Sequence, residues 1–86
     1  MFTVTWTPSA EEDLAFIWVN ADSSQRREIN SYTEAVIRNL RANADRIGES
    51  RESGVRILAE STLGVEFRVS VPDRLVTVFR LWPIRN

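Results

Sequence analysis

The amino-acid sequence predicts an α+β domain in which one strand comes first, two helices follow, and a three-stranded antiparallel meander comes last (β-α-α-β-β-β). Three observations lead to this expectation. Apolar and polar side chains alternate in residues 2–6 and 65–71, apolar residues recur at helical spacing between residues 10 and 44, and residues 75–82 are rich in β-branched and aromatic side chains. The chain has 86 residues, enough for one core, so we interpret residues 1–86 as a single domain.

The first strand is predicted over residues 2–6, and a helix follows it directly. Thr7 and Pro8 indicate the helix start, with Thr as the N-cap and Pro in the first turn. Ser9 and Glu12 also have the spacing of a capping box, so the sequence leaves the start between these two positions.

A short polar link separates this helix from a longer one. Asp22 and Gln25 form a second capping box, and the helix that they begin is predicted to run to about Ala44. Two helices joined in this way indicate an antiparallel helical hairpin. Apolar residues at helical spacing define the predicted inner faces, with Trp18, Thr33 and Ile37 beside them: Ala10, Leu14, Ile17 and Ala21 in the first helix, and Ile29, Tyr32, Val36 and Leu40 in the second.

The last third of the chain is predicted to form strands. Residues 44–54 are polar and are interpreted as a loop, residues 55–60 as a strand, and the two alternating segments after them as a hairpin that turns at residues 72–74. The expected register pairs Val71 with Leu75, Val69 with Thr77, Phe67 with Phe79, and Val65 with Leu81 on an apolar face. The opposite face then carries Glu66 paired with Arg80, Arg68 beside Val78, and Trp82 near Gly64.

Composition excludes several functional classes. The chain has no Cys and no His, so it lacks the usual ligands of zinc and haem and the commonest general acid–base residue. We therefore predict neither a metal site nor a cofactor. A formal net charge of −1 argues against a general attraction to nucleic acids. All 11 basic residues are nevertheless arginines, whose planar guanidinium suits local recognition of phosphate or carboxylate.

No targeting or membrane signal is present in the sequence. The chain contains no apolar run near the ~20 residues that a membrane span requires. Its N-terminal residues do not combine a basic region with an apolar stretch, as a signal peptide does. We expect a cytoplasmic protein that does not contact a membrane.

Four segments resemble, in their order and spacing, the RelE/ParE superfamily. These proteins are small toxins of bacterial type II toxin–antitoxin modules, and some are described as plasmid stabilisation proteins. The segments are T-W-T-P-S-A-E-E-D-L (5–14), G-V-R-I-L (54–58), V-E-F-R-V-S-V (65–71) and R-L-V-T-V-F-R-L-W (74–82). The resemblance covers nearly the whole chain and implies a growth-inhibiting toxin that a cognate antitoxin neutralises. Any contact with DNA is then expected only through the antitoxin.

The resemblance also implies candidate catalytic residues. RelE-like members cut mRNA in the ribosomal A site with basic residues on the concave face of the sheet. Carried over by position, these residues are Arg56, Arg68 and Arg85. The sequence departs from that pattern at Leu58, where a RelE-like member has a second basic residue, and its one tyrosine, Tyr32, lies on the apolar face of a helix. ParE-like members lack the nuclease set and inhibit DNA gyrase.

Three hypotheses about function follow. The first, slightly favoured, is a toxin that inhibits DNA gyrase by binding, as ParE-like members do. The second is a ribosome-dependent mRNA endoribonuclease, and the third a non-toxic relic that only binds its antitoxin. We expect Arg80, Trp82 and Glu66 to contact the target or the antitoxin. For Arg68 the sequence leaves two readings open, a phosphate-binding residue or a surface arginine paired with Glu66 or Glu60.

Overall fold

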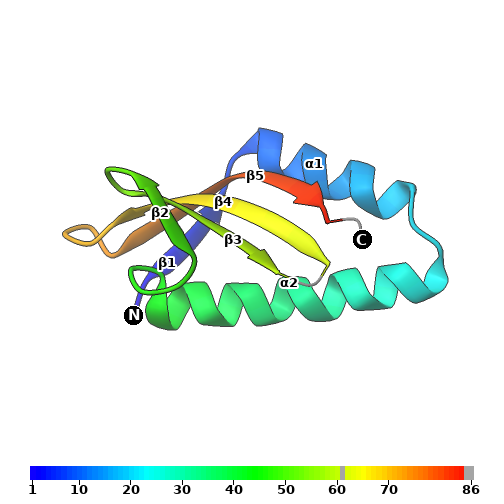
Figure 1. Cartoon of the computed structure of the whole chain (residues 1–86), viewed down its shortest axis with the longest axis horizontal. Coiled ribbons are helices and arrows are strands. Elements are labelled where there is room, and N and C mark those ends of the chain that lie inside the picture. The colour runs from blue at the N-terminus through cyan, green and yellow to red at the C-terminus, as the bar shows by residue number, and fades with distance from the viewer. Residues whose placement is uncertain (61, 85–86) are drawn as a thin grey trace.

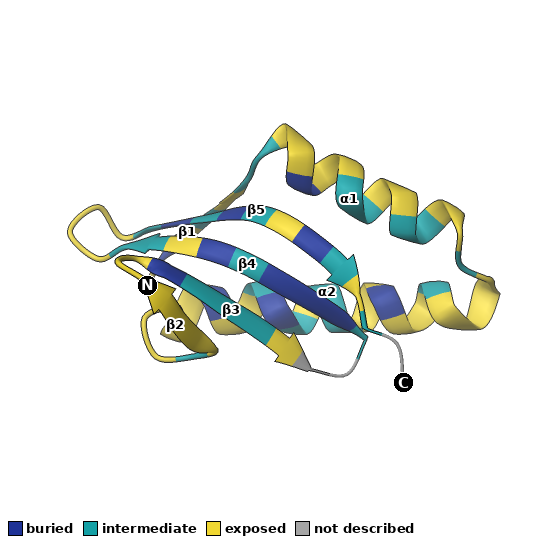
Figure 2. Cartoon of the chain, turned by 45° about the horizontal axis from the view of Figure 1, so that its top comes forward, coloured by how far each residue is buried: buried dark blue, intermediate teal, exposed yellow. Residues whose placement is uncertain are grey.

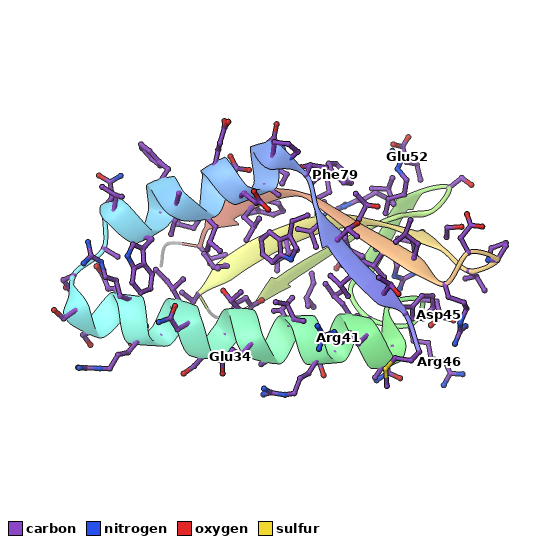
Figure 3. The ribbon with its side chains drawn as sticks, turned by 180° about the vertical axis from the view of Figure 1, so that it is seen from behind. Glu34, Arg41, Asp45, Arg46, Glu52 and Phe79 are labelled. Atoms are coloured by element: carbon purple, nitrogen blue, oxygen red, sulfur yellow. The ribbon has the colours of Figure 1, made fainter. Side chains whose placement is uncertain are left out.

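A computed structural model describes residues 1–60 and 62–84 as one mixed sheet with both helices on the same face (Figures 1 and 3). The sheet has five strands in the order β1-β5-β4-β3-β2. β1 is parallel to β5, and the other neighbours are antiparallel. The elements are β1 (Thr3–Trp6), α1 (Pro8–Val19), α2 (Ser23–Asn43), β2 (Glu49–Glu52), β3 (Val55–Glu60), β4 (Leu63–Ser70) and β5 (Leu75–Pro83).

The predicted order of elements is confirmed, and the structure adds one strand. β2 lies within residues 44–54, which we predicted to be a loop, and it pairs with β3 at the edge of the sheet. All four of its residues are exposed, so no apolar alternation marked it as a strand. Main-chain hydrogen bonds hold it in place, and charged side chains are typical of such an edge.

Local capping determines where both helices begin. The Thr7 side chain accepts a hydrogen bond from the Ala10 N–H at 3.1 Å, so α1 starts at Pro8 rather than at the alternative box further on. Asp22 and Gln25 form the predicted capping box with two reciprocal hydrogen bonds of 2.8 Å. Neither of these helices is apolar enough over a sufficient length to cross a membrane.

The core lies between the helices and the sheet face that they cover (Figure 2). Phe67, on the central strand β4, is 0% exposed and is the largest fully buried side chain. The apolar helix faces supply the other half of this core, as predicted. The buried residues of the cluster are Phe2, Ala10, Ile29, Val36, Leu40, Ala44, Leu63, Val65, Phe67, Val76, Val78 and Leu81.

The register of the β4–β5 hairpin was predicted correctly at one end and wrongly at the other. The pairs of Val65 with Leu81, Glu66 with Arg80, and Gly64 with Trp82 are confirmed. Nearer the turn the pairs are shifted by one residue: Val69 faces Val76, Phe67 faces Val78, Arg68 faces Thr77, and Ser70 faces Leu75. The predicted pairs of Val71 with Leu75, Val69 with Thr77, and Phe67 with Phe79 are therefore wrong.

A β-bulge at Phe79 explains this difference. The turn between β4 and β5 contains a residue in the left-handed region, Arg74, with φ of 53°. The first pair after the turn is Ser70 with Leu75, whereas the predicted first pair was Val71 with Leu75. The register then shifts between Glu66 and Phe67, which leaves Phe79 as the extra residue of β5. As a consequence Val76 and Val78 enter the core, and Phe79 moves to the other face of the sheet.

One side chain of α1 completes the hydrogen bonding of β5. β1 pairs with β5 only as far as Val78, so the edge of β5 beyond this point has no strand beside it. There the Asp13 carboxylate accepts a hydrogen bond from the Leu81 N–H at 3.0 Å. α1 thus packs against β5, and α2 packs against β1.

Candidate functional site

The face of the sheet that the helices leave uncovered carries most of the predicted site residues. We call it the open face. Because Phe67 points into the core, its neighbours on β4, Glu66 and Arg68, point the other way. Two arginine–aromatic contacts lie on this face, and the bulge at Phe79 accounts for the first of them. The Arg68 guanidinium lies 5.9 Å from the centre of the Phe79 ring, and the Arg80 guanidinium lies 4.8 Å from that of Trp82.

These four residues, Arg68, Phe79, Arg80 and Trp82, form what we call the arginine–aromatic strip. Sequence reasoning missed Phe79, which it assigned to the core. Its position on the open face could have been predicted only from a hairpin loop longer than the three residues that we assumed. The strip lies across β4 and β5, two antiparallel strands in the interior of the sheet.

Arg80 is held on two sides. Its Nε atom lies 3.0 Å from the Glu66 carboxylate, which confirms the predicted ion pair, and its flat face lies over Trp82. The Glu66 side chain is only 18% exposed, whereas that of Arg80 is 58% exposed. Arg80 therefore presents its outer edge to solvent in a fixed orientation. Arg68 differs, because it is exposed and forms no ion pair with any side chain that the structure describes. The side chain of Glu60, its other predicted partner, lies outside those described.

Trp82 can occupy its place on the open face because residue 64 is a glycine. A Cβ atom at position 64 would be 2.1 Å from Trp82 Cε2 and 2.5 Å from Nε1. The indole therefore lies directly on the backbone of β4, where any side chain would displace it. The sequence placed these two residues side by side, but the requirement for glycine became visible only in the structure.

The structure places two of the three predicted catalytic arginines, Arg56 and Arg68, on opposite faces of the sheet. Arg56 is the cross-strand partner of Phe67 and lies on the helix-facing side, opposite to Arg68. Its Nε donates to the Ile47 carbonyl at 2.7 Å, and its Nη2 donates to the Gly48 carbonyl at 3.0 Å. Arg85 lies outside the described residues. The catalytic roles of these residues stay predictions, but Arg56 has a structural role in holding the segment between α2 and β2.

This difference between the two arginines can be measured. We expect Arg56→Ala to lower the free energy of unfolding by about 1–3 kcal/mol, because it leaves two backbone carbonyls without their donor. Arg68→Ala removes an exposed side chain and should change the free energy of unfolding by no more than about 0.5 kcal/mol. Urea unfolding of both variants checks the prediction. Equal destabilisation by the two substitutions would contradict it.

The chemistry available on the open face favours binding over bond cleavage. Cleavage of RNA by its 2′-OH requires donors that converge on the charge of the phosphorane. Of the three arginines on β3, β4 and β5, one faces the other side and one is already paired with Glu66. Arginine does not deprotonate in proteins and so is not suited to act as a general base. The strip instead combines a fixed arginine with two aromatic rings, which suits contact with a macromolecule.

The chain shares its fold, a strand, two helices and an antiparallel meander, with chains of solved RelBE and ParDE toxin–antitoxin structures. The chain is similar to a chain of the toxin–antitoxin complex RelBE2 from Mycobacterium tuberculosis, with 19% identity, a TM-score of 0.77, and coverage of 99% of this chain and 93% of that one. A chain of the chromosomal ParDE system from P. aeruginosa matches with 21% identity, a TM-score of 0.72, and coverage of 99% and 98%.

A chain of the intact E. coli RelBE toxin–antitoxin complex is also similar, with 14% identity, a TM-score of 0.54 and complete coverage of both chains (100% and 100%). No protein-family model matches the chain, and no curated protein matches it. At these identities the similarity defines the fold. It extends to both RelE and ParE structures, so it does not distinguish between their mechanisms.

Proposed function

We propose that the chain is the toxin of a type II toxin–antitoxin pair, neutralised by a cognate antitoxin, and that it acts by binding a macromolecular target. DNA gyrase, the target of ParE-like toxins, is the first candidate. The similarity in fold over the whole chain, to structures of RelBE and ParDE systems, supports the toxin assignment. Any contact with DNA would come through the antitoxin, and the proposed targets lie in the cytoplasm.

The observation that carries inhibition by binding is the arrangement of arginines. Arg56 is engaged on the helix-facing side, and Arg80 is neutralised by Glu66, so the basic residues do not surround a common point. The aromatic rings of Phe79 and Trp82 lie beside Arg68 and Arg80 on an uncovered surface. Aromatic and arginine side chains dominate the binding energy of protein interfaces, which is the role we assign to the strip.

A supercoiling assay with purified DNA gyrase tests this proposal. We expect the purified protein to inhibit supercoiling, and Trp82→Ala to weaken inhibition about tenfold or more, since buried aromatic anchors contribute about 2 kcal/mol or more. Arg38→Ala, which removes an exposed arginine of α2, serves as a matched surface control and should not change inhibition. Normal supercoiling in the presence of excess protein would remove gyrase as the target.

One observation favours the alternative, a RelE-like endoribonuclease. Arg68 is exposed, lies on the open face and has no carboxylate partner among the described residues, as a phosphate-binding arginine should. Under the third hypothesis, a non-toxic relic, the protein would bind an antitoxin only. Induction of the chain alone in bacteria separates this case from the other two, because a relic would leave growth unchanged.

A further inference from the structure

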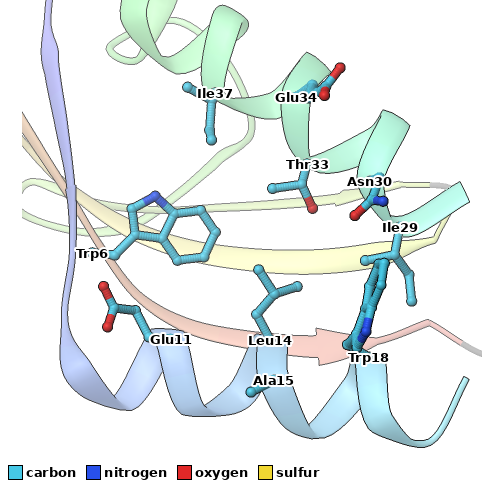
Figure 4. A pocket seen from close by; sticks show the side chains of 10 residues that line it. All are labelled: Trp6, Glu11, Leu14, Ala15, Trp18, Ile29, Asn30, Thr33, Glu34 and Ile37. Carbon is cyan, nitrogen blue, oxygen red and sulfur yellow. The ribbon is translucent and has the colours of Figure 1, made fainter. Parts of the chain in front are cut away.

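α1 is attached to the sheet through β5 and stands apart from α2. A groove of about 620 Å³ separates the two helices, and Trp6, Leu14 and Trp18 are part of its lining (Figure 4). On its other side α1 packs against β5, whereas α2 packs against β1. The position of α1 relative to the arginine–aromatic strip is therefore set where this helix meets β5.

The end of β5 that carries Arg80 and Trp82 has a neighbouring strand on one side only. β4 accompanies it as far as Pro83, but the pairing with β1 stops at Val78. The Thr7 N–H donates to the Val78 carbonyl at 3.0 Å, and the chain then turns away into α1. A strand end with one free edge opens more easily than a strand paired on both sides, so this end needs a second attachment.

Asp13 supplies that attachment from the second turn of α1. Its carboxylate accepts a hydrogen bond from the Leu81 N–H at 3.0 Å, although the two residues are 68 positions apart in the sequence. The Leu81 side chain is buried in the core and Asp13 is half-buried, so water competes for this bond only in part. A hydrogen bond to an ionised acceptor is about twice as strong as a neutral one.

Two ordinary roles of an aspartate do not account for Asp13. It forms no ion pair with any side chain that the structure describes. The helix dipole favours negative charge within the first turn of α1, where Glu11 lies, and Asp13 comes after that turn. Its hydrogen bond to the sheet is the interaction that distinguishes it from Glu11 and Glu12, which are both exposed.

The residue that Asp13 holds stands between two members of the strip. Successive side chains of a strand point to opposite faces, so Leu81 enters the core while Arg80 and Trp82 project onto the open face. Arg80 keeps a distance of 3.0 Å to Glu66 and stacks at 4.8 Å on Trp82. A rotation of the β5 end about its own axis would disturb both contacts, and the hydrogen bond at Leu81 opposes that rotation.

We propose that Asp13 is a positioning residue of the arginine–aromatic strip, which it holds through the main chain of Leu81. It acts through β5 and needs no contact with the target. The inference rests on the proposed function to the extent that the strip is the surface that binds the target. Without this carboxylate the end of β5 should open locally, while both helices and the rest of the sheet stay folded because their core packing is unchanged.

Amide hydrogen exchange followed by NMR tests the attachment itself. The ratio of the exchange rates of Leu81 and Val76 reports on the end of β5 alone, since Val76 belongs to the part that β1 accompanies. We expect Asp13→Ala to raise this ratio about tenfold, as the loss of one hydrogen bond to a charged group would. Asp13→Asn keeps an oxygen acceptor, so its ratio should stay within about threefold of the wild-type value.

Asp22→Ala is the matched control for the exchange measurement. The Asp22 carboxylate also accepts a hydrogen bond from a main-chain N–H, that of Gln25 at 2.8 Å, but this bond caps α2 and does not involve β5. The control should lower global stability and leave the ratio of Leu81 to Val76 unchanged. An unchanged ratio in Asp13→Ala, or an equal increase in both variants, would overturn the proposal.

The indole N–H resonances show whether the strip moves with Leu81. In Asp13→Ala we expect the Trp82 resonance to shift toward that of a solvent-exposed tryptophan, since the ring would leave its place over Gly64. Trp18 lies on the same helix as Asp13 and not on the strip, so its resonance should stay in place. Equal shifts of both resonances would mean that α1 itself has moved, which would contradict a role at the end of β5.

The supercoiling assay measures the consequence for binding. Asp13→Ala should weaken inhibition about fivefold, which is less than the effect of removing an anchor side chain, and Asp13→Asn should keep most of the inhibition. Glu12→Ala makes the same change in charge at the neighbouring exposed position and should inhibit normally. Normal inhibition by Asp13→Ala, in spite of faster exchange at Leu81, would overturn the proposal. If the wild-type protein does not inhibit gyrase, the proposed function fails, whereas the exchange and indole measurements still decide the role of Asp13.

Discussion

Phe67→Ala is expected to lower the free energy of unfolding more than any other substitution discussed here. The ring is 0% exposed at the centre of β4, where both helices and the neighbouring strands contribute to the core around it. Truncating such a buried phenylalanine costs about 3–5 kcal/mol, through lost burial and the cavity that remains. A small domain is stable by only about 5–15 kcal/mol, so the loss is a large part of the total. Urea unfolding followed by circular dichroism measures it.

The chain offers a matched control for this substitution. Phe16 is also a phenylalanine, but it lies on the outer side of α1 and is 72% exposed. Phe16→Ala should change the free energy of unfolding by no more than about 0.5 kcal/mol. If the two variants unfolded at similar urea concentrations, the arrangement of the core that we describe would be wrong.

The second large effect is expected from Gly64→Ala. The added methyl group would lie 2.1 Å from the Trp82 ring, so the indole must leave its place on β4. We expect a loss of about 1–3 kcal/mol, which is the usual cost of overpacking a filled site. The near-ultraviolet circular dichroism of Trp82 should change in the same variant. Because the indole stacks with Arg80, the strip would lose its fixed geometry, and target inhibition should fall as we expect for Trp82→Ala.

A double variant separates the steric effect from a backbone effect. In a Trp82→Ala background no ring lies over position 64, so adding Gly64→Ala should cost little further stability. Non-additivity of this kind measures direct contact between two residues. Additive losses in the double variant would show that the glycine is needed for its backbone and not for the tryptophan, contrary to our account.

Much of the fold could be predicted because local signals agree with the final structure. The cap at Thr7, the capping box at Asp22 and the helical spacing of apolar residues are all properties of short segments. β2 could not be found in this way, since its four exposed residues have no apolar face. The hairpin register was missed near the turn because it depends on loop length and on the bulge at Phe79, neither of which the alternation of side chains reveals.

The site could be predicted only where it depends on neighbouring residues of one hairpin. The pair of Glu66 with Arg80 follows from the β4–β5 register and was predicted. The side of the sheet that Arg56 occupies depends on how β3 is joined to β4, which the spacing of residues does not determine. The groove between α1 and α2 was also missed, because it arises from the way each helix packs on its own strand. Its tryptophans looked like ordinary core residues in the sequence.

Under the function that we propose, this protein inhibits its target by binding and does not cut RNA. Adding the purified protein to a bacterial cell-free translation reaction, and mapping the reporter mRNA ends by primer extension, tests that claim directly. We predict intact mRNA both with the wild-type protein and with Arg68→Ala. Codon-phased cuts that appear with the wild type and vanish with Arg68→Ala would contradict the claim, and would identify Arg68 as the residue on which a RelE-like nuclease depends.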